Sequence, residues 1–157
     1  MDIFTWLNGT ALVNWLLTTG WVYPWVISFH SIGMGFLVGI MYMLCLRLFG
    51  FGDFPVAPFE RYMLIVRIAF TVSLVTGATL FVLQAEKFFY SPTFRIKMLL
   101  IVFALLSTFF LTRSLFGRHA RWSGNGDAPG GIRTLAALTF VFWTGAIVAG
   151  RLTAYLP

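Results

Sequence analysis

Four long stretches of apolar residues limit how this chain can fold. They lie at about 22–46, 62–85, 96–112 and 134–155, and a helix needs about 20 such residues to cross the hydrocarbon layer of a membrane. Backbone groups cannot stay unpaired in lipid, and no stretch alternates polar and apolar residues as a membrane barrel strand does. The sequence therefore predicts an all-α polytopic membrane protein, with residues 1–157 forming one transmembrane domain, a four-helix bundle.

The composition agrees with this interpretation and bears on the partners. Of the 157 residues, 59% are hydrophobic and 10% are charged, whereas about a quarter of the residues in a soluble domain are charged. The net charge of +6 does not indicate nucleic-acid binding, because the predicted helices divide the cations between two membrane faces. We expect the lipid bilayer as a partner and no nucleic acid.

The segment 1–20 precedes the first apolar stretch. It has no basic n-region, carries Asp2 and has an interrupted apolar run, so we expect it to be retained and not cleaved as a signal peptide. Asn14 and Thr18 fall on one side at helical spacing, while Trp15 and Leu16 point elsewhere. This pattern predicts a short interfacial helix in the headgroup plane. An ordered loop with two buried tryptophans is the alternative.

The distribution of Lys and Arg predicts the orientation. The loops that join helices one to two and three to four, with their flanks, hold six cations: Arg47, Arg61, Arg113, Arg118, Arg121 and Arg133. The opposite side holds four: Lys87, Arg95, Lys97 and Arg151. Cytoplasmic loops carry the excess of Lys and Arg. Both termini are therefore expected outside the cytoplasm, in the periplasm of a Gram-negative host.

Several kinds of chemistry find no support in the sequence. Cys45 is the only cysteine, which excludes disulfides within the chain and thiolate clusters. The apolar stretches contain no Asp or Glu, so no catalytic triad or carboxylate pair can form inside the membrane. His119 lies in a basic loop and is expected to be solvated. An enzyme with its own catalytic residues is the least expected function.

A few ionisable residues remain within the helices or at their edges. An ionisable group at membrane depth suggests function, and the sequence offers His30, Arg67, Glu86, Lys97 and Arg151. With the predicted orientation, His30 lies about 12 Å below the outer boundary by the helical rise. Lys97 and Arg151 lie in the same outer half, whereas Arg67 lies near the cytoplasmic side. We therefore expect His30, Lys97 and Arg151 to converge.

This pattern suits a haem or a quinone. Imidazole is a common axial ligand of haem iron, and cations nearer the water can pair with the propionates. His30 is the candidate metal ligand, and Gly33 leaves space for a macrocycle or a neighbouring helix. A second axial ligand for haem b would have to be Met34, Met98, another methionine, a partner's residue or none. Alternatively, His30 hydrogen-bonds a quinone carbonyl.

A purely structural interpretation is equally open. Small residues four apart, such as Gly35 and Gly39, are ordinary helix-packing devices in membranes. His30 can hydrogen-bond across helices, and Lys97 and Arg151 can extend to the headgroups. The chain then binds no cofactor.

Several short motifs carry a family resemblance across Pro24 to Phe116. They are His30 with Gly33 and Gly39, Leu46-Arg47-Leu48 with Gly50, Thr76-Gly77, and Ser91-Pro92 with Phe94, Arg95 and Lys97. In these the chain resembles a family of uncharacterised bacterial four-helix membrane proteins, a domain of unknown function. A looser likeness to four-helix b-type cytochrome subunits rests on architecture and His30. Ile27 and Cys45 stand where members of the family often carry acids. The resemblance implies a bacterial inner-membrane protein without assigning an activity.

Two functions are therefore predicted from different classes. In the first, the chain is a small membrane subunit that binds haem b or quinone near the periplasmic face for electron transfer, through His30, Gly33, Met34, Lys97 and Arg151. In the second, it is an accessory subunit of a larger membrane complex with no cofactor of its own. Other membrane subunits or further copies of the chain are the expected protein partners.

Overall fold

The computed structural model describes residues 11–83, 85–117, 122, 126–153 and 155. This part of the chain consists of helices joined by loops and contains no strand. The helices are α2 (Ala11–Thr18), α3 (Val22–Leu48), α4 (Phe59–Leu83), α5 (Ala85–Tyr90), α6 (Pro92–Phe116) and α7 (Gly130–Leu152). Four of them, α3, α4, α6 and α7, are long and apolar enough to span a membrane. The predicted fold class is confirmed: this is a multi-pass membrane protein with a four-helix bundle.

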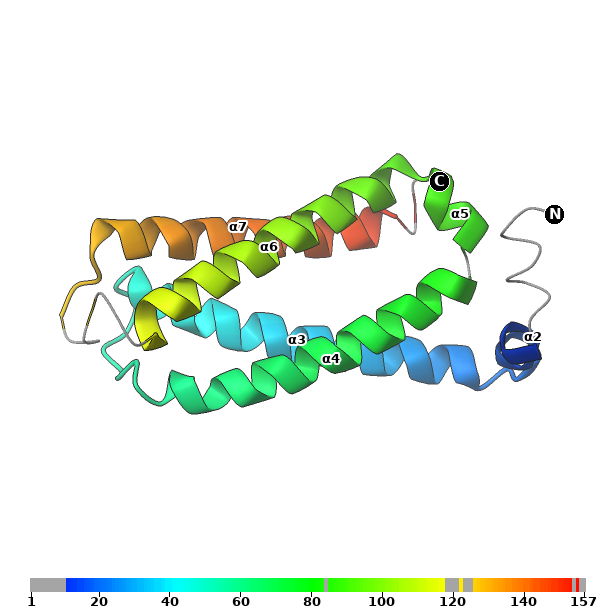
Figure 1. Ribbon diagram of the computed structural model, residues 1–157, viewed down its shortest axis with the longest axis horizontal. Coiled ribbons are helices and arrows are strands. Elements are labelled where there is room, and N and C mark those ends of the chain that lie inside the picture. Colours follow the sequence, from blue (N-terminus) through cyan, green and yellow to red (C-terminus); the bar gives the residue numbers. More distant parts are fainter. Residues whose placement is uncertain (1–10, 84, 118–121, 123–125, 154, 156–157) are drawn as a thin grey trace.

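The long helices form two antiparallel hairpins. α3 packs against α4, α6 packs against α7, and α3 also packs against α7. Figure 1 shows the α3–α4 and α6–α7 connections at one end, which we call the loop end, and α2 and α5 at the other, which we call the α5 end. The hairpins draw apart toward the α5 end (Figure 1).

The observed helix ends differ from the predicted ones by two to four residues, apart from the start of α3. α6 begins at Pro92, four residues before the predicted start, because Ser91 caps it: the Ser91 side chain accepts a hydrogen bond from the backbone N–H of Phe94, at 3.4 Å. Proline suits the first helical position because its ring presets φ and it lacks an N–H. α4 and α7 likewise start earlier than predicted, at Phe59 and Gly130, and both end earlier.

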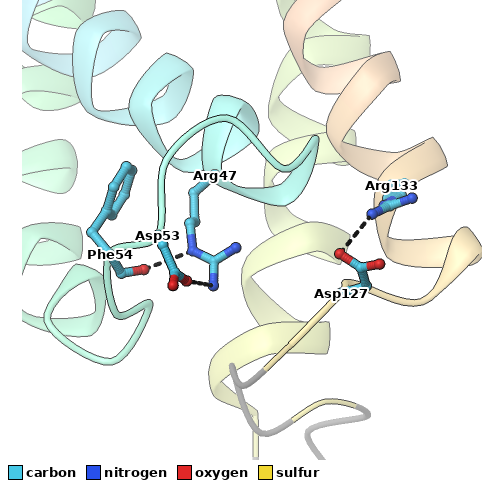
Figure 2. Close-up of polar contacts among 5 residues, drawn as sticks. All are labelled: Arg47, Asp53, Phe54, Asp127 and Arg133. Atoms are coloured by element: carbon cyan, nitrogen blue, oxygen red, sulfur yellow. Dashed lines mark hydrogen bonds and ion pairs between the residues drawn. The ribbon is translucent and has the colours of Figure 1, made fainter.

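Two arginines at the loop end serve the connections (Figure 2). Arg47 is buried; its Nε donates to the carbonyl oxygen of Phe54 at 2.7 Å, and its guanidinium lies 3.6 Å from the Asp53 carboxylate. Gly50 adopts a φ of +93°, which glycine tolerates best, where the chain leaves α3. Across the bundle, Arg133 pairs with Asp127 at 3.3 Å. These ion pairs fix the two loops, whereas Arg61, Arg67 and Arg113 form no ion pair within the described residues.

The hydrophobic core occupies only the loop-end half of the bundle. Its buried residues come mainly from the second halves of α3 and α6 and the first halves of α4 and α7, and include Met41, Leu44, Leu111 and Ala136; Trp143 lies just past the middle of α7. The buried residues in the other half are mostly small or polar. The α5 end is therefore held less by large apolar side chains.

Residues Ala11–Thr18 form the helix α2, where the sequence allowed either a short helix or an ordered loop. α2 lies across the α5 end of the bundle (Figure 1). Its buried contact is Val13, which is 1% exposed, whereas Trp15 points outward. The loop with two buried tryptophans is therefore wrong for Trp15, and the other tryptophan, Trp6, lies outside the described residues. α5 was not expected, because six residues give too short a pattern to detect.

Gly33 marks the closest approach of α3 and α4. A β-carbon placed on Gly33 would lie 2.5 Å from Oγ of Ser73 and 2.9 Å from the carbonyl oxygen of Ala69. Small residues at such crossings let helix backbones meet in a membrane. The space at Gly33 is thus filled by the neighbouring helix, one of the two uses expected for it.

Replacing Gly33 with alanine should destabilise the bundle. We expect Gly33→Ala to lower the free energy of unfolding by about 1–3 kcal/mol, the usual cost of an overpacked contact. Unfolding in mixed micelles, followed by circular dichroism, measures the change. Gly39→Ala is the matched control, because a β-carbon there meets nothing within 4 Å. Equal stability of the two variants would contradict the close approach.

Candidate functional site

His30 lies between α3 and α4 at the α5 end. It is eight residues into α3, about 12 Å along the axis. Its Nδ1 lies 3.0 Å from the carbonyl oxygen of Ser73 and 3.1 Å from Oγ1 of Thr76. A β-carbon on Gly77 would lie 3.1 Å from Cε1 of the ring. The imidazole is therefore seated against one turn of α4, and its plane is fixed by that turn.

These contacts determine which ring nitrogen carries the proton. A carbonyl oxygen only accepts hydrogen bonds, so Nδ1 must donate to Ser73. The Thr76 hydroxyl donates to the carbonyl of Val72 at 2.6 Å, which leaves its oxygen to accept from His30 as well. In the neutral ring Nε2 is then an acceptor. A carbonyl acceptor at one nitrogen is the arrangement that orients a liganding histidine.

Lys97 brings a positive charge to the same end from α6. Its Cε and Nζ would lie 3.4 and 3.6 Å from a β-carbon on Gly150, so the side chain runs along the bare backbone of α7. Nζ also stands 5.9 Å from the centre of the Phe94 ring. No described side chain forms an ion pair with Lys97.

The other predicted residues take different places. Met34 packs against the hydrophobic core one turn from His30 on the same helix. It cannot be the opposite axial ligand to His30, because a haem between the two would cut through the α3 backbone. Arg151 lies in the last turn of α7 and is exposed, next to the glycine over which Lys97 lies.

Of the five ionisable candidates, His30 and Lys97 both lie in the α5-end halves of their helices, α3 and α6. Arg67 lies toward the loop end, as expected. The side chain of Glu86, in α5, and all of His119 lie outside the described residues. No group of three or more His, Cys, Asp or Glu side chains that could hold a metal ion occurs in the described chain.

Arg67 is a second unusual cation. It is exposed on α4, and among the described residues its guanidinium has no acidic or hydrogen-bonding partner. An arginine at the centre of a membrane costs about 2.5–3.5 kcal/mol on insertion scales. Its α-carbon lies eight residues into the helix, about 12 Å from the start, so a compensating contact is needed.

Sequence analysis missed Ser73 and Thr76, which orient the imidazole. The signal was present, because Thr76 and Gly77 form one of the motifs that carry the family resemblance. Only the tertiary structure shows that this turn of α4 faces His30. Ser73 contributes its backbone carbonyl, and a backbone group leaves no trace in the residue type.

An apolar hollow of about 460 Å³ lies near the site. Its lining includes Phe81 and Phe94, whose rings stack at 5.4 Å, and Met98. Neither His30 nor Lys97 lines it. Phe81 lies one turn beyond Gly77 on α4, toward the end of the helix. Its volume falls in the range of small-molecule pockets.

Comparison with known proteins returned no family model, no curated protein and no solved structure that matches the chain. The resemblance to the uncharacterised bacterial family stays a prediction.

The proton on His30 can be tested directly. With nitrogen-15 histidine and His119→Gln to leave one ring, we expect the neutral His30 signal to show a protonated Nδ1 and an unprotonated Nε2. Solid-state nuclear magnetic resonance of the protein in bilayers distinguishes the two nitrogens. A protonated Nε2 in the neutral ring would contradict the bond to Ser73. Thr76→Val should keep the tautomer, because the carbonyl still accepts.

Proposed function

We propose that the chain is a membrane subunit that binds a quinone headgroup at the α5 end, through His30. The observation that carries the proposal is the Nδ1 hydrogen bond to Ser73, which leaves Nε2 of a fixed, half-buried imidazole as an acceptor. An imidazole so placed accepts from the hydroxyl of a quinol. Lys97 supports the proposal, because an ammonium donates to a quinone carbonyl.

The packing of the bundle also supports this location. The large apolar side chains of the core are gathered in the loop-end half. His30, Lys97 and their small or polar neighbours occupy the half where the hairpins draw apart (Figure 1). The apolar hollow near Phe81 would take part of the isoprenoid tail of a quinone. Ligand sites between bundle helices combine apolar walls with a few placed polar groups in this way.

Haem b fits the described residues less well than quinone. His30 has the oriented imidazole of an iron ligand. Met34 lies one turn away on the same helix, which would leave no room for a macrocycle between the two side chains. Met98 is exposed on α6, where it lines the hollow. A six-coordinate haem would therefore need a ligand from another protein. We therefore propose a quinone as the ligand of His30.

The location of the protein is part of the same proposal. We place it in the inner membrane of a bacterium with both termini in the periplasm, so that the α5 end faces the periplasm. The excess of arginines at the loop end supports this orientation. Electron transfer would then require partner subunits that supply or accept the electrons.

A cofactor-free accessory subunit is the second candidate. It is favoured by the exposed face of α3 that carries Gly35 and Gly39, where an added β-carbon meets nothing. Such a face suits close packing with a helix of another subunit. In that case His30 only ties α3 to α4.

Binding of a short-chain ubiquinol analogue, kept reduced, to the purified protein tests the two functions. We expect saturable binding by calorimetry in detergent, and His30→Ala should weaken it about tenfold, the worth of one buried hydrogen bond. Lys97→Met should weaken it by a similar factor. His119→Gln is the matched control and should bind as the unmodified chain does.

Two results would contradict the quinone site. Equal affinity of His30→Ala and the unmodified chain, with both folded by circular dichroism, would favour the accessory subunit. A reduced-minus-oxidised absorption spectrum with a b-type α-band that disappears in His30→Ala would favour haem.

A further inference from the structure

A second cavity lies toward the loop end, and Leu37 in its lining is two turns beyond His30 on α3. It has a volume of about 160 Å³ and lies between α4 and α6, with Leu37 and Met41 of α3 and Trp143 of α7 at its base. Nearly all of its lining surface is apolar. An apolar cavity of this size stays dry and accepts an apolar ligand.

The cavity opens on the lipid-facing surface of the bundle. The bundle is most open between α4 and α6, because these two helices do not pack along each other in the described structure. Phe109 of α6 lines the cavity and is 55% exposed, and Arg67 of α4 lines it and is also exposed. These two residues stand at the mouth, where an acyl chain of the surrounding bilayer meets the protein.

Arg67 gives the mouth a positive charge. Side chains on a helix lean toward its N-terminus, so Arg67 leans toward the loop end and the headgroups of that leaflet. Arg113 lies one turn beyond Phe109 on the same face of α6 and is exposed. Arg47 and Arg133 each form an ion pair with an aspartate (Figure 2). Arg67 and Arg113 form no ion pair within the described chain.

We propose that this cavity binds an anionic phospholipid of the loop-end leaflet, with one acyl chain between α4 and α6 and its phosphate held by Arg67 and Arg113. The guanidinium fork matches a phosphate bidentately. Basic pockets between membrane helices suit anionic headgroups. The bound lipid supplies the partner that Arg67 lacks and fills the seam that α4 and α6 leave open. The site does not depend on the quinone proposal.

Lipid retention by the full-length protein tests the site. Protein from phosphatidylcholine micelles is exposed to phosphatidylglycerol or to further phosphatidylcholine with the same acyl chains, and bound lipid is counted by native mass spectrometry. We expect about tenfold tighter retention of phosphatidylglycerol, because phosphatidylcholine has the same phosphate but carries a choline cation that the two guanidinium groups repel. Arg67→Gln should abolish this preference. Arg61→Gln, on the same helix and also exposed but outside the cavity lining, should keep it.

A second measurement reports on the acyl chain. Brominated acyl chains quench tryptophan fluorescence on contact, and Trp143 lines the cavity although it is only 2% exposed. The quenching by brominated phosphatidylglycerol should fall in Trp143→Phe, and Leu105→Phe, which narrows the cavity, should reduce it while Arg67 stays in place.

Three outcomes would overturn the proposal. The first is equal retention of both lipids by the unmodified chain. The second is loss of preference in Arg61→Gln as large as in Arg67→Gln. The third is a change of oligomeric mass in Arg67→Gln with unchanged lipid retention, which would mean that another protein helix covers the cavity.

Discussion

The packing of large apolar side chains in one half of the bundle governs the rest of this structure. Met41, Leu44, Leu111 and Trp143 interlock near the loop end, where the buried guanidinium of Arg47 also secures the α3–α4 connection. In lipid, van der Waals packing and interhelical hydrogen bonds hold helices together, because the surrounding tails are as apolar as leucine. A firmly packed half lets the two hairpins diverge beyond it without losing the fold.

The diverging half uses a different means of contact. Gly33 brings α3 against the backbone of α4, and one turn earlier on α3 His30 donates to a carbonyl of that helix. Gly150 similarly admits the stem of Lys97 to the backbone of α7. Each hairpin is thus joined through backbone contacts at this end, and polar side chains occupy the region between membrane surface and core. A rigid support beneath a few polar groups is the general design of a binding site in a membrane bundle.

Lys97 and Arg67 form no ion pair within the described residues, lie in opposite halves of the bundle and call for different ligands. Lys97 and His30 lie in the same half of the bundle, where, under the proposed function, their donor and acceptor bind one small polar headgroup. Arg67 stands at the mouth of an apolar cavity, which suits an amphiphile that is charged at one end only. The difference lies in the neighbours of each cation, since a charge alone selects no ligand.

The sequence by itself determined the four crossings and the positions of His30, Lys97 and Arg67 along them, because lipid forces long apolar segments into helices of known rise. The sequence also contains the signal for the start of α6, Ser91-Pro92. The capping hydrogen bond from Phe94 to Ser91 became evident only in the structure. Tertiary structure alone decided that Gly33 faces α4, that Met34 enters the core and that Ser73 offers its carbonyl to His30. Those outcomes depend on the rotation of each helix about its axis. Helices that are apolar all round carry little information about that rotation, so only the packed bundle fixes it.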